Sequence, residues 1–494
     1  MSASLRLRII IAIISIFIIL LPLLIVRFPP SADLPQHVSQ VRLFLDTLKN
    51  PAGPYRILWG APNNLVYALV GLGWVFGGPE NAGRLTLIFL VALWTVGAAF
   101  LATRGGRPPE TAVLLAVLVF NHSLYWGFFN FLLGWPAFIL LFALTTRKTD
   151  KLPIWKEALL YLVFSFLLLQ SHALWFAVGT AWIILHSIVR KIPVKIFIAR
   201  LLGLFPCIVL SVIWYPSLSS SRITAGFGTA PHWILSPFER LLPQNVLNST
   251  FGGLFGITES VIFIGIVAWM CISFLENRKN MVNVANRDAL LAAGLFFAIA
   301  WLAPDKYMNT IYFASRWLPC GIAMLLLGIP SPFNKSWLRR MISFGLTGAL
   351  VLSTAFTWSR WEKEEMSGLH EALTAIPSSS RVLGLDFVKE SKFIKGRPFI
   401  QIFAYSQALK GGEVNFSFAE HSSGIVAFKE RRRIQWTPGL EWFAEKVRIS
   451  DLARFDYALV NGKKDIHDKF VDIKNLECVT NSGRWRLYRV LPVK

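Results

Sequence analysis

Long apolar runs constrain the fold of this chain more than any other feature. About 20 consecutive apolar residues are needed to cross a bilayer as a helix, and Leu7–Val26 is the first run of that kind. The further runs that we predict to span the membrane are 84–103, 111–129, 131–146, 156–171, 173–189, 196–215, 258–275, 288–303, 310–329 and 338–358. The chain is 54% hydrophobic and only 16% charged, which is too apolar for a soluble protein. We therefore predict an α-helical polytopic membrane protein with about 11 transmembrane helices.

The basic residues predict the orientation of these spans. The net charge is +22, and the basic residues that precede the last span gather in short connections. Positive charge concentrates on the cytoplasmic side of membrane proteins, so this charge indicates topology and argues against nucleic acid as a partner. The connections predicted to lie inside carry Arg104 and Arg107; Arg147, Lys148 and Lys151; Arg190 and Lys191; Arg278, Lys279 and Arg287; Lys335, Arg339 and Arg340. We expect a cytoplasmic N-terminus and an extracytoplasmic C-terminal region in a bacterial inner or plasma membrane.

The spans divide the chain into two predicted domains. Residues 1–358 form a transmembrane domain that begins with an uncleaved anchor, because Arg27-Phe28-Pro29-Pro30 is a poor cleavage site. Its large outer loop, 27–83, contains Leu65–Phe76, which is too short to cross and is expected to lie along the interface or re-enter. Residues 359–494 lack long apolar runs and are predicted to form an extracytoplasmic α/β domain. The expected strands are 381–387, 398–409, 455–462 and 484–493, with a helical stretch at Gly439–Lys446.

Acidic residues are scarce before residue 359. Of the 28 in the chain, 17 lie in the C-terminal region, and none of the others is near the middle of a predicted span. Ion-coupled transporters commonly keep carboxylates inside the membrane, so this distribution weighs against a transporter. Asp33 follows the first span directly in SADLPQH and is the best-placed catalytic carboxylate. It would also cap a helix that begins with Leu34 and Pro35, and both interpretations stay open.

Three histidines are candidate substrate contacts at the outer face. His37 follows Asp33 by four residues, so a helix would place both on one face. It could orient Asp33, contact a sugar or phosphate, help hold a metal ion, or be a satisfied polar group. His122 in FNHSLYWGFFNF and His172 in LLQSHALWF fall near outer span ends, with aromatic neighbours. Those aromatics fit an interfacial belt or a surface that stacks on sugar rings.

Basic residues at the outer face are candidates for binding a lipid phosphate, which requires cations at the membrane surface. The candidates are Arg56, Arg222, Lys306 and Arg316. Arg316 in YFASRWLP lies inside an apolar span, where a guanidinium needs a partner or must reach the surface by snorkelling. The four cysteines form neither a disulfide framework nor a metal-ligand pattern. No cofactor is assigned, and a divalent metal ion stays open with Asp33 and His37 as its candidate ligands.

This pattern resembles the GT-C superfamily of membrane glycosyltransferases, which take sugars from polyprenyl-phosphate carriers. The similarity rests on an inner N-terminus, a first span followed by a large outer loop with an early acid (ADLPQH), an interfacial helix and an outer C-terminal domain. It also rests on ENAGRLTLIFL at the start of a span, later outer-face histidines and YFASRWLP in a late span. The resemblance covers essentially the whole transmembrane region.

The resemblance implies roles for single residues. Asp33 matches the first-loop acid that such enzymes use as catalytic base, and Arg316 matches a late-span basic residue with a role at the carrier phosphate. Relatives of the lipid A aminoarabinose transferase type often have a Lys-Pro-Pro-like stretch where this chain has GAPNN, Gly60–Asn64. Arg56 is the substitute we consider for the phosphate contact assigned there. The WWD motif of oligosaccharyltransferases is absent, which argues against protein N-glycosylation.

The activity implied by the resemblance is an inverting transfer of a hexose or pentose from a polyprenyl-phosphate carrier. The acceptor would be an extracytoplasmic glycan, lipid or protein. Asp33 would accept the proton of the acceptor hydroxyl, while Arg316, with Lys306 or Arg56, would stabilise the departing phosphate. Two other functions stay open at this stage: a lipid-linked saccharide transporter or flippase, and a catalytically silent GT-C-like protein that binds a partner.

Overall fold

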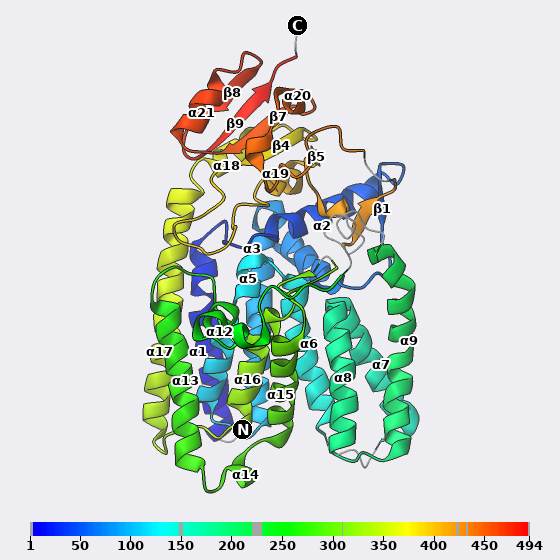
Figure 1. Ribbon diagram of the computed structural model, residues 1–494, viewed down its shortest axis with the longest axis vertical. Coiled ribbons are helices and arrows are strands. Elements are labelled where there is room, and N and C mark those ends of the chain that lie inside the picture. The colour runs from blue at the N-terminus through cyan, green and yellow to red at the C-terminus, as the bar shows by residue number, and fades with distance from the viewer. Residues whose placement is uncertain are drawn as a thin grey trace.

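A computed structural model of the protein describes residues 3–147, 152–219, 230–308, 310–420, 424–430 and 433–492. Its long helices run along the long axis of the molecule, and a β-sheet built from residues 381–490 covers one end of this bundle (Figure 1). The first helix, α1 (Ala3–Ile25), starts at the opposite end. Below, the end that carries the sheet is called the sheet end, and the other is called the far end.

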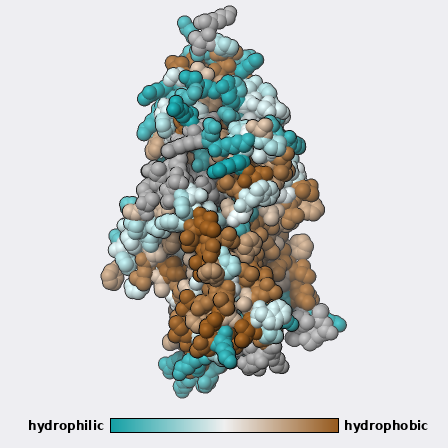
Figure 2. All heavy atoms as spheres, turned by 90° about the vertical axis from the view of Figure 1, so that its right-hand side faces the viewer, coloured by the Kyte–Doolittle hydropathy of each residue, from teal (hydrophilic) through white to brown (hydrophobic). Residues whose placement is uncertain are grey.

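Among the described residues, six helices are long and apolar enough to cross a membrane. They are α1, α3 (Leu65–Arg104), α7 (Ile154–Ser171), α9 (Val194–Ser219), α13 (Thr258–Asn277) and α17 (Ser336–Arg360). Other apolar helices of the bundle are α6 (Phe129–Thr145), α8 (Ala173–Val189), α15 (Arg287–Leu302) and α16 (Leu318–Gly328). Hydrophobic side chains gather over the bundle and hydrophilic ones over the sheet (Figure 2). The chain is an integral membrane protein.

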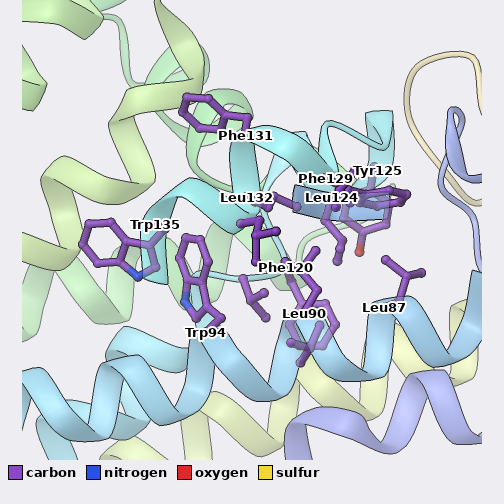
Figure 3. Close-up of a cluster of buried hydrophobic side chains, with 14 of the residues drawn as sticks. Leu87, Leu90, Trp94, Phe120, Leu124, Tyr125, Phe129, Phe131, Leu132 and Trp135 are labelled. Carbon is purple, nitrogen blue, oxygen red and sulfur yellow. The ribbon is translucent and has the colours of Figure 1, made fainter. Parts of the chain in front are cut away.

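Large side chains fill the space between α3 and α6. Leu87, Leu90 and Trp94 of α3 lie opposite Leu132 and Trp135 of α6 (Figure 3). The ring centroids of Trp94 and Trp135 are 5.5 Å apart, and each side chain is 1% exposed. Because a buried aromatic ring removes roughly 150–250 Å² from solvent or lipid, this cluster fixes α6 against α3.

The predicted span 111–129 is wrong. The structure has α4 (Pro109–Val117), a turn and α5 (His122–Trp126) before α6 begins. Asn121 starts α5 by accepting a hydrogen bond from the Ser123 amide at 2.9 Å, and Gly127 ends it with a φ of 84°. Residues 113–120 are each at most 1% exposed, so this run is apolar because other helices surround it. Breaks in a helix are tolerated inside protein, where the freed backbone groups find partners.

One further predicted span differs from the structure. The predicted span 310–329 consists of β3 (Thr310–Ile311), the 3₁₀ turn η1 (Ser315–Trp317) and α16, and β3 pairs with β2 (Lys306–Tyr307). Leu65–Phe76, expected to lie along the interface or re-enter, is the first arm of α3. A kink at Gly78, with a φ of 65°, separates this arm from the second, which contains the predicted span 84–103.

The region after α17 contains a five-stranded sheet in the order β5–β4–β7–β9–β8. Its strands are β4 (Arg381–Asp386), β5 (Glu413–Val414), β7 (Tyr457–Asn461), β8 (Leu476–Thr480) and β9 (Trp485–Val490). β4 is parallel to β5 and β7, whereas β9 is antiparallel to β7 and β8. Three of the four predicted strands therefore contain β4, β7 and β9. The helical stretch expected at Gly439–Lys446 is reduced to the 3₁₀ turn η4 (Ala444–Lys446).

The fourth predicted strand, 398–409, is wrong. It forms turns and then α19 (Ala404–Lys410), which packs on α2 (Leu34–Lys49). Ser39 of α2 donates a hydrogen bond to the Ala404 carbonyl at 2.8 Å. The packing of α19 on α2 explains why this stretch is apolar. The helix α2 lies across the sheet end of the bundle, beneath α19 (Figure 1). A second link is the antiparallel pair β1 (Tyr55–Ile57) and β6 (Val426–Phe428).

Short elements complete the described chain. The helices are α11 (Pro237–Arg240), α12 (Pro243–Thr250), α14 (Met281–Val284), α18 (Leu369–Ala375), α20 (Ile449–Leu452) and α21 (Lys464–Val471). A π-helical turn, η2 (Trp361–Glu365), extends α17, and the 3₁₀ turn η3 (Phe418–Glu420) precedes β6.

A buried ion-pair cluster joins α7, α8 and α9. Arg200 of α9 is fully buried and donates to Glu157 of α7 at 3.2 Å and to Ser187 of α8 at 3.2 Å. Its guanidinium lies 5.0 Å from the ring centroid of Tyr161, and Arg147 also pairs with Glu157. Removing one partner of such a pair leaves a buried charge uncompensated, which costs about 3–5 kcal/mol.

We predict that Glu157→Gln strongly lowers the thermal unfolding midpoint of the detergent-solubilised protein, because the buried guanidinium of Arg200 then lacks its carboxylate partner. Glu364→Gln is the matched control: Glu364 pairs with Arg360 at 2.8 Å, but both side chains are more than 40% exposed. Exposed pairs contribute about 0–1 kcal/mol, so this variant should unfold close to the wild type. Equal midpoints for the two variants would contradict the structural role of the cluster.

Candidate active site

Asp33 occupies the N-terminal end of α2 and is held against α5 by main-chain hydrogen bonds. The Ala32 amide donates to the Tyr125 carbonyl at 2.9 Å, and the Asp33 amide donates to the Trp126 carbonyl at 3.2 Å. Asp33 is the N-cap residue of α2, yet within the described chain its side chain makes no capping hydrogen bond. Helix capping, one of the two interpretations left open by the sequence, therefore does not explain this carboxylate.

Gly127 permits the close approach of α5 to Asp33. A Cβ atom at this position would lie 2.7 Å from the Asp33 nitrogen and 2.8 Å from its Cβ, and the φ of 84° also favours glycine. The Gly127 carbonyl accepts a hydrogen bond from Nε2 of His37 at 3.3 Å. One glycine thus positions both polar residues of the SADLPQH stretch.

The ionisation of Asp33 is shifted by its surroundings. Its side chain is partly exposed, but protein surrounds the carboxylate. Burial raises the pKa of Asp33 to about 7, and the positive charge of Arg316 opposes this rise. A carboxylate with a pKa near neutrality can accept and release a proton at physiological pH, as a general base must.

Arg316 lies in η1 and does not snorkel to a surface, since only 6% of it is exposed. Its guanidinium sits 3.5 Å from the ring centroid of Phe128 and donates to the Ile311 carbonyl at 2.6 Å. Its Nε has no hydrogen-bond partner in the part of the chain that the structure describes. The charge of Arg316 acts on Asp33, His122 and His172. The structure therefore brings these four sequence-predicted residues together.

His37 is buried in an aromatic environment. Its ring centroid lies 5.3 Å from that of Phe129, 5.7 Å from that of Tyr67 and 5.6 Å from that of Phe418. Burial lowers the pKa of His37 to about 4, so the imidazole is neutral at physiological pH. Across the described residues, no three His, Cys, Asp or Glu side chains group as metal ligands. The contacts of His37 fit a residue that positions Gly127 and α2.

The other two histidines have different surroundings. The ring of His122 lies 4.5 Å from that of Tyr312, centroid to centroid, and faces a cavity. His172 is the N-cap of α8: its Nδ1 accepts a hydrogen bond from the Leu174 amide at 3.1 Å. Burial, reinforced by Arg316, lowers the pKa of each to about 3. His122 is available to a ligand, whereas His172 has a structural contact.

A cavity of about 930 Å³ is lined by residues of both the bundle and the C-terminal region. Its lining comes from residues 234–235, α5, α12, residues 252 and 255, the segment 305–315, the segment 390–397 and residues 442–443. Lys306, His122 and Tyr312 contribute from the bundle side. Asp33 and Arg316 adjoin the bundle side of the cavity. The Asp33 amide is hydrogen-bonded to the carbonyl of the lining residue Trp126, and Arg316 follows the lining residue Ser315 in the chain. Ligand sites are commonly concave and of about 300–1,000 Å³.

The remaining sequence-predicted candidates lie elsewhere. Arg56 is exposed on β1, opposite Ala427. The strand β1 follows the C-terminal end of α2, whereas Asp33 lies at the N-terminal end of that helix. Arg222 lies outside the described residues. In the GAPNN stretch, the Asn63 side chain is 7% exposed and accepts from the Ala173 amide at 2.8 Å, which gives it a structural role.

Sequence reasoning missed the basic residues that the C-terminal region brings to the cavity. Lys395 and Arg397, in KESKFIKGR, lie about 80 residues beyond Arg316 along the chain but share the cavity with Lys306. It also missed Tyr312, whose ring centroid is 5.1 Å from that of Trp126 in the wall; Trp126 is one of the aromatics near His122 for which a belt or sugar-stacking role was left open. The density of basic residues in that stretch was the one available signal, and nothing in the sequence showed which surface they face.

Comparisons with known proteins show which fold carries this site. No protein-family model matches the chain, and no curated protein is similar to it in sequence. ArnT from Cupriavidus metallidurans in the apo state aligns over 99% of this chain and 98% of its own, with a TM-score of 0.52 and 9% identity. The chain has the GT-C fold.

Two more structures with the GT-C fold are similar. ArnT bound to undecaprenyl phosphate aligns over 99% of this chain and 98% of its own with a TM-score of 0.50 and 10% identity. Arabinofuranosyltransferase AftD from Mycobacteria aligns over the whole of this chain with a TM-score of 0.51 and 14% identity. The chain spans 40% of the length of AftD. The expected resemblance to GT-C glycosyltransferases is confirmed at the level of the fold.

We predict that Gly127→Ala abolishes the candidate site, because the added methyl group displaces Asp33. Gly106→Ala is the matched control: its φ of 66° imposes a similar backbone strain, but no atom lies within 4 Å of the added Cβ. That strain costs about 1–2 kcal/mol. The control should lose a little thermal stability and keep ligand binding. A Gly127→Ala protein that behaves like Gly106→Ala would show that the close approach is dispensable.

Proposed function

We propose that the protein is an integral membrane glycosyltransferase that moves a hexose or pentose from a polyprenyl-phosphate carrier to an extracytoplasmic acceptor. The observation that carries this proposal is Asp33: a carboxylate surrounded by protein and pinned to α5 by main-chain hydrogen bonds, with its pKa raised to about 7 beside a buried arginine. The GT-C fold supports the reaction class, and the solved complex of ArnT with undecaprenyl phosphate supports the carrier. The acceptor is a glycan, lipid or protein.

In the proposed reaction Asp33 is the general base. Its carboxylate takes the proton of the acceptor hydroxyl as that oxygen attacks the anomeric carbon, which inverts the configuration. The bond between the anomeric carbon and the phosphate oxygen breaks, and its electron pair stays with the leaving polyprenyl phosphate. Arg316 supplies positive charge beside this centre, where low solvent access makes electrostatic stabilisation effective.

The proposed orientation places the sheet end outside the cytoplasm. The basic connections predicted to lie inside then face the cytoplasm, and the C-terminal region 359–494 is extracytoplasmic. A lipid-linked saccharide transporter and a catalytically silent binding protein are the competing functions. Both lack the transfer step, so an assay of transfer separates them from the enzyme.

We predict that Asp33→Asn lowers the rate of sugar transfer by about 10²–10⁴-fold, the usual contribution of a general base. Purified protein would be supplied with polyprenyl-phosphate hexoses and pentoses and with envelope lipid and glycan extracts as acceptors. Asp46→Asn is the control: Asp46 also lies on α2 but pairs with Arg42 at 2.8 Å near the surface, and it should keep full activity. Unchanged transfer by Asp33→Asn would remove Asp33 from the mechanism. Movement of lipid-linked sugar across vesicles without transfer would establish the transporter instead.

We predict that transfer requires deprotonation of a group with a pKa near 7, so kcat/KM rises as the pH increases through that value. Arg316→Gln removes the charge that opposes the rise in the pKa of Asp33, so the midpoint of this profile should move to higher pH. Arg42→Gln, which alters an arginine paired with Asp46, should leave the midpoint unchanged. A midpoint that stays constant in Arg316→Gln would contradict the coupling of Arg316 to the base.

A further inference from the structure

The segment 390–397 of the C-terminal region is fixed to the bundle by two buried glutamates. Glu259 of α13 is 2% exposed and accepts hydrogen bonds from the Gly253 and Leu254 amides at 2.9 and 2.8 Å. It also accepts one from Nζ of Lys395 at 3.2 Å. Glu365, at the end of η2, accepts from the Lys392 amide at 2.9 Å and from the Ser391 hydroxyl. These contacts anchor both halves of the segment.

Backbone contacts fix the same segment against the cavity. The Lys395 amide donates to the Gly253 carbonyl at 2.9 Å, and the Phe255 amide donates to the Phe393 carbonyl at 3.2 Å. Gly396 has a φ of 84°, and a Cβ at this position would lie 3.6 Å from the indole nitrogen of Trp126. The segment therefore meets the wall next to Asp33, and it is part of the site's architecture.

Arg397 brings a positive charge to the side of the cavity that the C-terminal region forms. It lies 5.6 Å from the ring centroid of Trp442 and makes a long hydrogen bond of 3.5 Å to the Trp442 carbonyl. Its charge acts on Tyr312, which lines the cavity from the bundle side. Within the described part of the chain, no carboxylate pairs with Arg397. Lys395, by contrast, is paired with Glu259.

Two acids line the cavity, Asp305 and Glu390, and the charge of Asp305 is already compensated. Asp305 pairs with Arg240 at 2.8 Å and accepts from the Ile234 and Leu235 amides at 2.7 and 3.0 Å. Asp305 is therefore not a free counter-ion for Arg397. The lining carries three basic side chains and two acidic ones, Asp305 and Glu390, and Arg397 is a basic one that no described carboxylate pairs with. This favours an anionic ligand group near Arg397.

An apolar cavity of about 450 Å³ adjoins the first one. The two share Leu235, Asn245, Ser249, Asp305 and Ser315 in their linings, and the second is completed by side chains such as Phe297, Trp301 and Leu318. A cavity that presents Arg397 beside an apolar pocket suits an amphipathic anion, with the charged group near Arg397 and a hydrocarbon chain among the α15 and α16 side chains. A free anion would leave the apolar pocket without a ligand.

We infer that Arg397, held by the segment 390–397, binds the phosphate of the lipid-linked sugar donor, so that the C-terminal region completes the donor site of the bundle. This inference rests on the proposed function. A guanidinium can donate two parallel hydrogen bonds to a phosphate, which is the geometry this contact requires. Arg397 makes the phosphate contact that Arg56, exposed on β1, is too remote to make. The GAPNN stretch cannot make this contact either, because it contains no cation.

The test measures binding of a fluorescent short-chain polyprenyl monophosphate to the purified full-length protein by fluorescence anisotropy. Charge-assisted hydrogen bonds contribute enough that Arg397→Gln should weaken binding by about 10–100-fold, and Arg397→Lys should recover part of the loss. Lys392→Ala is the matched control, because Lys392 is exposed on the same segment and its side chain lies outside the cavity lining. It should bind like the wild type, and thermal unfolding should show that all three variants are folded.

Competing ligands identify the source of the phosphate. Unlabelled polyprenyl phosphate should displace the probe, whereas polyprenol and inorganic phosphate at the same concentration should not. Effective displacement by inorganic phosphate would overturn the assignment to a lipid-borne group. Unchanged affinity in Arg397→Gln would overturn the role of Arg397.

The same assay separates this inference from the proposed catalytic role of Asp33. Asp33→Asn should lose transfer and still bind the probe, because it loses the base and keeps the phosphate contact of Arg397. If wild-type affinity persists in Arg397→Gln while transfer still depends on Asp33, the inference fails and the proposed function stands. If the wild type binds no polyprenyl phosphate and transfers no sugar, both fail.

Discussion

The candidate site depends on a balance between two opposing effects on one carboxylate. Burial disfavours the charged form of Asp33, and the charge of Arg316 favours it. Burial alone would leave the group protonated over much of the physiological range, while a strong ion pair would make it too weak a base. The combination brings the pKa of Asp33 to about 7, which suits proton transfer at neutral pH. The proposed chemistry therefore requires both residues to be placed by the fold.

That placement comes from interruptions in the helices. The break between α4 and α5 presents the carbonyls of Tyr125 and Trp126 to the chain at Ala32 and Asp33. The 3₁₀ turn η1 begins α16 and positions Arg316 over Phe128, directly after α5. Non-helical backbone at membrane depth is stable only where protein or a water-filled cavity satisfies it. The same burial that permits these breaks also desolvates the carboxylate.

The sequence predicted the parts of this arrangement that follow from local rules. The apolar runs predicted the ends of α7, α8, α13 and α17 to within two residues, because these helices meet the 20-residue length of a bilayer or nearly so. It failed at 111–129 and 310–329, since apolar composition cannot distinguish contact with lipid from burial among other helices. It failed again at 398–409, where packing on α2 decides the structure.

For the site, the sequence predicted the residues next to the first span and the late-span arginine, but not all of their neighbours. Asp33 and Arg316 stood out because charges are rare beside or inside apolar segments. Lys395 and Arg397 did not stand out, because the C-terminal region contains many basic residues and their positions depend on long-range contacts with Glu259 and Gly253. Local sequence cannot select one cation from such a set.

The contacts of α2 explain why the C-terminal region bears on the site at all. One face of α2 meets α3, while Gln36 and Ser39 donate hydrogen bonds to Gln401 and Ala404 on the other side. The helix that begins at Asp33 is thus held between the bundle and α19. Loosening either contact would move the carboxylate relative to Arg316, and its pKa would change with that distance. The C-terminal region therefore holds the proposed base through the position of α2, independently of the phosphate contact proposed for Arg397.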